Sequence, residues 1–522
     1  MGEEPRVWEY ETSHRGCDVT GPLPEPHPKD RMTLDTLPAD IDTGEPMDAT
    51  TKAPAVRSGV LPILLVAAFV VILNETAMNV ALTRIMDDLH IAERLAQWLT
   101  TAFMLTMAVV IPTTGWLIER LGTRRAYVAA LGLFSLGTLI CLVSPTIGVL
   151  LAGRVVQASG TAFMMPLLMT TVMQTVDPAH RGRVMGNVSM VISVAPAVGP
   201  TMSGLLLQFG SWRLIFGAVL PIALAMLFLG RRRLTDVSES SGAQLDAASI
   251  PLAVLGFGGL VYGLSLVGDA TAAPWELGVA LGVGTTALLA FVVRQLLLQR
   301  RDAALLDLRT FTHAGFSIGL GLMALAMMGL FGTIITLPLL LQRAFGMTPL
   351  QVGLLMLPGG ALMGVLGPFV GRLYDRLGPR VLVGPALTVV AGVFAALSSL
   401  STATPWWFIL ACHLVMSASF AFIFTCLFTT SLGALPPHLY SYGSASVGTI
   451  QQLAGAAGTA LFVTIFTMQA GVARDAGASE AASLLAGSHW GFVGASAMMA
   501  VAAVASLLLR HDPDAAAPAP MH

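Results

Sequence analysis

The sequence predicts an all-α polytopic membrane protein built from two similar halves. Hydrophobic residues make up 55% and charged residues 11% of the 522 residues, and the mean hydropathy is +0.75, a composition typical of membrane-embedded chains. Fourteen long apolar runs follow one another along the chain, and one short loop sequence occurs twice. Together these observations predict fourteen transmembrane helices and an internal duplication.

The apolar runs fall into groups of six, two and six. A helix needs about 20 apolar residues to cross a hydrocarbon core of about 30 Å. The first group is expected at 60–82, 97–118, 126–144, 147–174, 183–208 and 213–230. Two additional helices are expected at 249–269 and 276–298. The last group is expected at 314–341, 350–372, 380–399, 406–432, 443–468 and 489–509.

Polar segments divide the chain into domains. The N-terminal segment is rich in Pro, Asp, Glu and Thr and lacks both the basic region and the apolar region of a signal peptide, so we expect a disordered tail, with Met32 or Met47 as alternative starts. The predicted domains are a cytoplasmic tail at 1–57, an N-terminal six-helix bundle at 58–230, a cytoplasmic linker at 231–248, two additional helices at 249–298, a C-terminal six-helix bundle at 299–510 and a cytoplasmic tail at 511–522.

The arginines predict the orientation of the chain. Cytoplasmic loops of membrane proteins carry an excess of Lys and Arg. With the N-terminus inside, sixteen arginines after the tail fall in cytoplasmic segments and five fall outside. We therefore expect a multi-pass protein of the cytoplasmic membrane with both termini in the cytoplasm.

Composition and spacing exclude several classes of function. The net charge of −2 and the lack of a separate basic domain exclude nucleic-acid binding. The four cysteines show neither a C-x-x-C nor a Cys/His spacing, so we expect no disulfide framework and no metal site. A membrane-embedded enzyme would need a nucleophile with its base, or a metal cluster, at membrane depth, and the sequence shows neither.

The repeated loop runs from Gly115 to Arg125 (GWLIERLGTRR) and again from Gly371 to Arg380 (GRLYDRLGPR). Gly122 and Gly378 follow predicted helix ends, where glycine tolerates a positive φ. Gly115 and Gly371 let neighbouring helices approach. The two copies align at a constant offset of 256 positions, which pairs Gly115, Glu119, Arg120, Gly122 and Arg124 with Gly371, Asp375, Arg376, Gly378 and Arg380. An acid followed by Arg predicts a charged contact between helices, and an ordinary basic cytoplasmic loop is the alternative.

Both copies resemble the loop between helices 2 and 3 of major facilitator superfamily transporters, whose pattern is G-x-[LF]-[AS]-[DE]-[RK]-x-G-[RK]-[RK]. The resemblance implies the major facilitator fold, with two pseudo-symmetric six-helix bundles around a central cavity and two extra central helices. It also implies that the two loops act as gating elements on the cytoplasmic side. A channel is the alternative from another class, but a duplicated gating loop favours alternating access.

Two further stretches resemble motifs of the same superfamily. The stretch LLAGRVVQASGTA contains Arg154 followed by Gln157, which resembles the motif of helix 4 and implies a role of Arg154 in proton coupling. Hydrogen bonding of Arg154 to backbone carbonyls is the alternative. The stretch GNVSMVISVAPAVGPTMSG resembles the antiporter motif of helix 5, which implies export, although Ala195 and Ser203 replace two glycines. The positions that match are Gly186, Gly199, Pro200 and Gly204.

Glu75 is the only carboxylate deep within a predicted helix. A charge there costs a few kcal/mol, so Glu75 and Arg154 are expected to face a cavity or a partner. The surrounding LNETAMNVALT resembles the L-D-x-T-x-x-N-V-A-L-P stretch of the fourteen-helix drug:proton antiporter family, but the acid stands one residue later. The resemblance implies that Glu75 carries the coupling proton, and the alternative is that it only orders polar neighbours.

Several other residues at membrane depth are candidates for the substrate cavity. They are polar, or flexible and apolar, and Met and Phe suit a pocket that adapts to varied ligands. The candidates are Asn79, Gln157, Met165, Asn187, Phe331 and Gln451. A lone histidine such as His413 is expected to be a packed, hydrogen-bonded residue.

The resemblance covers residues 60–510 and implies a secondary active transporter. We expect a proton-coupled antiporter that exports drugs or other amphipathic small molecules by alternating access. Its partners are small-molecule substrates, protons and the lipid bilayer, its energy source is the proton motive force without a cofactor, and it works as a monomer. The alternative is an exporter of the same fold with one dedicated substrate, such as a self-made antibiotic, a lipid or a metabolite.

Overall fold

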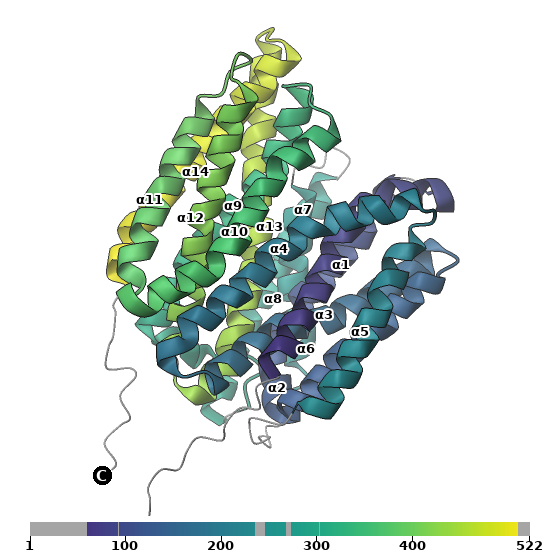
Figure 1. Cartoon of the computed structure of the whole chain (residues 1–522), viewed down its shortest axis with the longest axis vertical. Helices are drawn as coiled ribbons and strands as arrows, with labels where there is room; N and C mark the ends of the chain where they lie inside the picture. Colours follow the sequence, from purple (N-terminus) through teal and green to yellow (C-terminus); the bar gives the residue numbers. More distant parts are fainter. Residues whose placement is uncertain (1–59, 92, 235–245, 268–272, 302, 510–522) are drawn as a thin grey trace, which may run out of the picture. The chain divides into compact units, whose positions relative to one another are not determined.

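The structure, a computed structural model, describes residues 60–91, 93–234, 246–267, 273–301 and 303–509. Every regular element in these ranges is a helix, as the sequence predicts (Figure 1). The first half contains α1 (Val60–Leu89), α2 (Glu93–Val143), α3 (Ile147–Thr175), α4 (Arg181–Gln208) and α5 (Arg213–Arg233). The middle contains α6 (Ser249–Ala253), the π-helical turn η2 (Val254–Gly258), α7 (Gly259–Leu266) and α8 (Pro274–Leu298). The second half contains α9 (Ala314–Arg343), α10 (Pro349–Leu377), α11 (Pro379–Ser398), α12 (Trp406–Gly433), α13 (Tyr440–Asp475) and α14 (Glu480–Ala505).

Thirteen helical segments of the described chain are long and apolar enough to cross a membrane. One of them, Leu95–Val143, has 49 residues, roughly twice the length that one crossing needs. Gly122, at φ 75° and ψ 164°, interrupts this segment, so α2 contains two of the predicted crossings. When α2 is counted as two crossings, the thirteen segments give the fourteen membrane helices that the sequence predicts.

The largest differences from the predicted helix boundaries lie in the second half. A loop was expected between 468 and 489, but α13 continues to Asp475 and α14 begins at Glu480. The intervening sequence is rich in alanine, which has the highest helix propensity, and the Ser479 side chain caps the backbone N–H of Ala482 at 3.3 Å. A search for apolar runs misses such a segment because many of its residues are small or polar.

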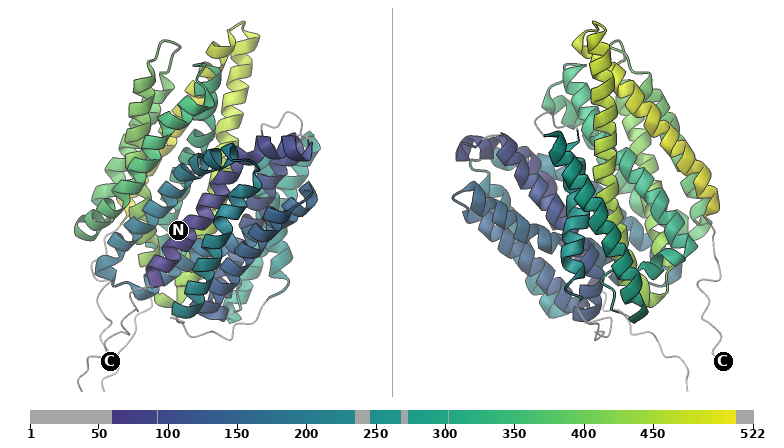
Figure 2. Two further views of the ribbon diagram at one scale, coloured as in Figure 1. Left: turned by 45° about the vertical axis from the view of Figure 1, so that its right-hand side comes forward. Right: turned by 180° about the vertical axis from the view of Figure 1, so that it is seen from behind.

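The helices of each half pack on one another, and the two halves meet along several pairs of helices, among them α12 and α4, where the Thr425 hydroxyl donates to the Ser189 hydroxyl at 2.8 Å. Within the first half α1 contacts α4 and α5, and within the second half α9 contacts α13 while α11 contacts α14. Across the halves, α4 packs on α10 and α2 packs on α13. Figures 1 and 2 show α4 beside α10, at the boundary between the early helices and the late ones.

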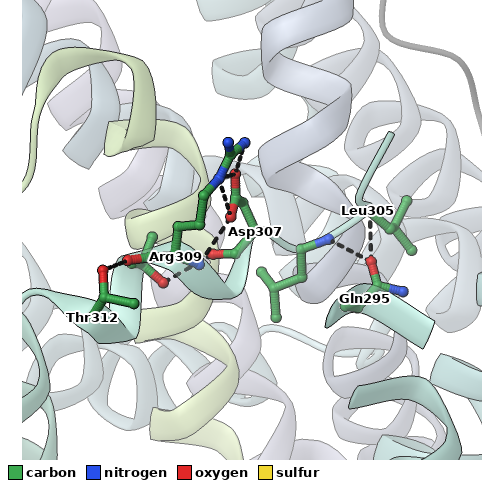
Figure 3. A network of polar contacts seen from close by, with 7 residues as sticks. Gln295, Leu305, Asp307, Arg309 and Thr312 are labelled. Carbon is green, nitrogen blue, oxygen red and sulfur yellow. Dashed lines mark hydrogen bonds and ion pairs between the residues drawn. The ribbon is translucent and has the colours of Figure 1, made fainter. Parts of the chain in front are cut away.

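A short segment after α8 folds back against the bundle (Figure 3). The Gln295 carboxamide oxygen accepts hydrogen bonds from the backbone N–H groups of Leu305, at 2.7 Å, and Leu306, at 3.2 Å. Both leucine side chains are buried, in a cluster with Trp116 of α2 and Phe291 of α8. The segment therefore ties the additional helices to the first half.

An ion pair also fixes the end where α1 meets α5. The Asp88 carboxylate accepts hydrogen bonds from the Trp212 indole N–H, at 2.9 Å, and the Arg213 guanidinium, at 3.0 Å. These hydrogen bonds lower the pKa of Asp88. The same arginine donates to the carbonyl oxygen of Ser144, at 2.8 Å, so it connects the ends of three helices.

Candidate transport site and gate

The acid of each repeated loop lies at the start of a helix in the opposite half. The Asp375 carboxylate, in the last turn of α10, accepts hydrogen bonds from the backbone N–H groups of Gly182, at 2.8 Å, and Arg183, at 2.9 Å. These N–H groups lie in the first turn of α4, where backbone donors lack partners within the helix and the helix dipole favours a negative charge. Asp375 therefore caps a helix of the other half.

The first copy of the loop makes the corresponding contact. The Ser441 hydroxyl, in the first turn of α13, donates a hydrogen bond of 2.5 Å to the Glu119 carboxylate. Ser441 lies 259 positions after Gly182, close to the offset of 256 between the two loops. A 3₁₀ turn that begins with proline precedes α4 (Pro178–His180) and α13 (Pro437–Leu439) alike. The two halves thus exchange equivalent contacts, each between a loop acid and a helix start.

The sequence pattern predicts the acids but not their partners. We expected a charged contact between helices, and the Asp375 carboxylate makes its contact with backbone N–H groups of α4. No ion pair joins Asp375 and Arg376 within the described part of the chain. The repeated proline turn before α4 and α13 is the signal in the sequence that marks the partner positions.

Glycines allow the backbones of the two halves to touch beside these acids. A Cβ atom added to Gly371 would clash with the carbonyl oxygen of Gly182, and one added to Gly186 would clash with that of Gly367. A Cβ atom on Gly115 would lie 3.1 Å from the backbone of Ser441 and Tyr442. The structure therefore shows the two halves in close backbone contact at the end that carries the repeated loops.

The remaining loop residues shape the turns and the ends of helices. Gly122 and Gly378 have φ values of 75° and 73°, which confirms the predicted positive φ. The Arg124 guanidinium donates to the carbonyl oxygen of Arg231, at 2.8 and 3.2 Å, and so caps the C-terminal end of α5. The Arg120 guanidinium lies 5.3 Å from the centre of the Trp116 ring. The side chains of Arg376 and Arg380 are exposed.

Arg154 is 1% exposed and is held by a polar network inside the first half. Its guanidinium donates to the Gln157 side-chain oxygen, at 2.7 Å, and Gln157 in turn donates to the Thr138 hydroxyl, at 2.8 Å. The guanidinium also lies over the Phe103 ring, 4.0 Å from the ring centre, and donates to the carbonyl oxygen of Leu99 at 3.4 Å. The sequence left open that Arg154 only bonds backbone carbonyls between helices. One of its hydrogen bonds, to Leu99, is of this kind, and the other goes to the Gln157 side chain.

Glu75 lies in α1, in the turn that packs against Gly199 of α4. A Cβ atom on Gly199 of α4 would clash with the Thr76 hydroxyl and would lie 3.1 Å from the carbonyl oxygen of Leu73. The Glu75 side chain is partly exposed, and no hydrogen bond or ion pair with another described residue reaches its carboxylate. Arg154 is close enough for its charge to act on Glu75. Beside Glu75, the Asn74 carboxamide is buried and both of its polar atoms lack a described partner.

The antiporter motif of α4 joins these two regions. Gly186 packs against the second half, and Gly199, almost four turns further on, packs against α1 beside Glu75. A Cβ atom on Gly204 would have nothing within 4 Å. We define the gate as the contacts of α4 with α10 and of α2 with α13. The helix α4 therefore takes part in the gate and also contacts the turn of α1 that carries Glu75.

The residues predicted to line the substrate cavity differ in their exposure. Gln157 is fully buried and both ends of its carboxamide are used by Arg154 and Thr138. Phe331 lies beside Gly455 of α13, where a Cβ atom would be 3.3 Å from the ring. Met165, Asn187, Phe331 and Gln451 are partly exposed. The side chains of Asn79 and Pro200 lie outside the described part of the structure, although both residues belong to helices.

Comparison with known proteins places the chain in a family. The sequence pattern of the Major Facilitator Superfamily matches residues 64–459. The lincomycin resistance protein LmrB of Listeria monocytogenes is 37% identical over 453 residues, which cover 85% of this chain and 95% of that protein. The multidrug export protein EmrB of Haemophilus influenzae is 28% identical over 431 residues, which cover 79% of this chain and 82% of that protein.

Solved structures show the same fold. The human organic anion transporter MFSD10 aligns over 86% of this chain and 99% of its own, with a TM-score of 0.61 and 15% identity. The proton:xylose symporter XylE aligns over 85% of this chain and 94% of its own, with a TM-score of 0.56 and 12% identity. The chain belongs to the Major Facilitator Superfamily and is a multi-pass membrane transporter, not an enzyme.

Proposed function

We propose that the protein exports drugs or other amphipathic small molecules in exchange for protons by alternating access. The observation that carries this proposal is the Glu75 carboxylate, which is partly exposed inside α1 and has no hydrogen-bonding partner among the described residues. A carboxylate at this depth is costly when charged, so it favours binding a proton or a cation. Its place beside Gly199 puts this exchange next to the helix that also forms the gate.

The gate contacts support alternating access. The halves touch through backbone and through two acid contacts at one end, and no disulfide holds them in the described part of the chain. Such contacts stabilise one state by a few kcal/mol, which a substrate or a proton is able to offset. On the orientation that the arginines predict, the contacts are cytoplasmic and this structure corresponds to a state closed to the cytoplasm.

The names of the relatives support export as the direction of transport. They include a lincomycin resistance protein and a multidrug export protein. We propose a broad range for this protein because Met165 and Phe331 are flexible or flat apolar side chains that are partly exposed. Export of lincomycin alone, among several unrelated compounds, would identify the dedicated alternative.

The test of proton coupling is export driven by a pH gradient in proteoliposomes. Glu75→Gln keeps the size of the side chain but does not titrate, so it should abolish gradient-driven export while substrate still binds. Asp87→Asn is the matched control, because Asp87 is an exposed acid near the end of the same helix. Export by Glu75→Gln at the wild-type rate would show that the proton uses another group.

The test of orientation uses reporter fusions. We propose that both termini are cytoplasmic and that the protein functions as a monomer in the cytoplasmic membrane. Fusions at Ser240 should then report the cytoplasm, and fusions at Ala272 should report the outside; both positions lie outside the described residues. Reports from the same side would contradict the placement of the two additional helices.

A further inference from the structure

A cavity of about 580 Å³ lies outside the region of Glu75 and the gate, between the start of α2 and the additional helices. Its walls come from α2, from η2 and α7, and from the first part of α8. Because α2 runs from Glu93 to the loop at Gly122, Trp98 and its neighbours lie toward the end of the bundle that is opposite the gate. None of the roles proposed above uses these residues.

The glycines of η2 and α7 explain why the cavity is on this side. Gly256 and Gly259 lie against the backbone of α8 at Leu288 and Gly284, where added Cβ atoms would approach to 2.9 Å. The side toward α2 is looser, and a Cβ atom on Gly258 would lie 3.3 Å from the Val109 side chain. The wider π-helical turn, a feature that recurs at functional sites, thus forms one wall of the cavity.

The lining combines apolar surface, aromatic rings and one negative charge. Trp98 and Tyr262 stack with ring centres 5.8 Å apart and planes inclined by 29°. Glu276, in the first turn of α8, is the one charged residue of the described lining, which contains no Arg, Lys or His. Aliphatic side chains such as Leu105 and Val283 line the rest.

This chemistry selects a cation with an apolar body. A carboxylate attracts a positive charge, and aromatic faces stabilise the same charge by about 0.5–2 kcal/mol. Apolar walls take up the remainder of the ligand. An anion would meet Glu276 without a compensating cation, and a neutral hydrocarbon would gain nothing from the carboxylate. We propose that the cavity binds amphipathic cations that enter it from the bilayer.

The exposure of the rim supports entry from the bilayer. Leu255 and Val283 are 49% and 45% exposed, and they lie on two different walls of the cavity. In a membrane-spanning chain, exposed apolar side chains at this depth face lipid. An amphipathic cation that partitions into the bilayer therefore reaches the cavity without passing the gate.

The experiment is photolabelling of the full chain in lipid nanodiscs with azidophenyl-triphenylphosphonium, a lipophilic cation. Peptide mapping should place label on the start of α2 and the first half of α8. Val283→Trp fills the cavity and should reduce this label about tenfold, a change of about 1.4 kcal/mol in binding. The matched control is Val293→Trp, because Val293 lies on the same helix, is 57% exposed and is not part of the lining.

Competition experiments test whether the cavity prefers a cation over other ligands. Excess tetraphenylphosphonium should remove the label, whereas tetraphenylborate, an anion of the same shape, should not. Glu276→Gln should weaken competition by the cation several-fold, while Glu480→Gln, at the start of α14, should not. Equal competition by cation and anion, or label that persists in Val283→Trp, would overturn the proposal and leave an apolar groove filled by lipid. Label in the cavity without any export of tetraphenylphosphonium would contradict the proposed function but not this site.

Discussion

The Asp375 carboxylate accepts a hydrogen bond of 2.8 Å from the backbone N–H of Gly182, so the last turn of α10 caps the first turn of α4 in the opposite half. The same carboxylate binds the N–H of Arg183, at 2.9 Å. In the pseudo-symmetric position, Glu119 accepts from Ser441 of α13. The repeated loops therefore act on the start of the helix that faces them, and this relationship makes their acids specific targets for mutation.

Asp375→Asn combined with Glu119→Gln should slow export several-fold without preventing folding. Asparagine offers one oxygen to the two N–H groups and removes the charge at the start of α4, which should weaken the closed gate by about 1–2 kcal/mol. Initial rates of export in proteoliposomes, normalised to the amount of protein, measure the effect. Asp475→Asn is the control, because Asp475 is exposed at the other end of α13. An unchanged rate in the double variant would remove these acids from gating.

Alanine at two glycines of the antiporter motif should have opposite outcomes. Gly186→Ala places a Cβ atom against the carbonyl oxygen of Gly367, so α4 and α10 must separate, at a cost of about 1–3 kcal/mol. Export should fall while the protein still reaches the membrane. Gly204→Ala meets open space and should export at the wild-type rate. Equal behaviour of the two variants would show that close packing at Gly186 is not required.

The fold was predictable from the sequence because a bilayer imposes simple rules. Helices of about 20 apolar residues and the duplication of the Gly115 loop indicated the helices and the two halves. The sequence did not predict the continuation of α13 to Asp475 or the π-helical turn at Val254–Gly258, since neither changes the apolar content of a run. Helix ends outside the hydrocarbon core depend on propensity and capping instead.

The candidate site was only partly predictable. Motifs indicated Glu75, Arg154 and Asp375 because charges at membrane depth and repeated acids are rare enough to stand out. Their partners, among them Phe103 and Ser441, come from other helices and carry no signal in a single sequence except the repeated proline turn. Tertiary contacts of ordinary side chains need the packed structure.

Arg294→Gln should destabilise the protein at neutral pH and less so in acid. The Arg294 guanidinium binds Asp246 with two contacts of 2.6 Å and lowers the pKa of Asp246 to about 2. A lowered pKa stabilises the fold above the unfolded value near 3.8, and this contribution disappears as the pH falls through about 2. Because Arg294 is 39% exposed, solvent screens the pair and we expect only a small loss of stability at pH 7.

Thermal unfolding in detergent micelles measures this difference between pH 7 and pH 3. The gap in melting temperature between wild type and Arg294→Gln should shrink as the pH approaches 3, where Asp246 is largely neutral in the unfolded chain. Arg300→Gln removes an exposed guanidinium close to the end of the same helix and should show no such gap. A gap that stays constant with pH would show that Arg294 stabilises the protein through packing alone.

Gln157→Leu should disable transport by releasing Arg154. Leucine fills a similar volume but removes the oxygen that holds the guanidinium at 2.7 Å and the amide that donates to Thr138 at 2.8 Å. A buried guanidinium that loses an acceptor costs about 1–3 kcal/mol, so we expect a lower melting temperature and a displaced Arg154. Proton-driven export should fall more than substrate binding, because the charge of Arg154 acts on Glu75.

Thr171→Val is the matched control for this variant. Thr171 is buried in the same helix as Gln157, but its hydroxyl donates to the carbonyl oxygen of Leu167 within that helix and does not reach Arg154. Its loss should leave export and the pH dependence of export unchanged. Gln157→Glu tests whether the position of the Arg154 guanidinium or the charge around it matters. This variant keeps an acceptor for the guanidinium but adds a carboxylate that competes with Glu75 for Arg154. If Gln157→Leu exports at the wild-type rate with the wild-type pH dependence, the orientation of Arg154 does not matter and its role is confined to packing α2 against α3.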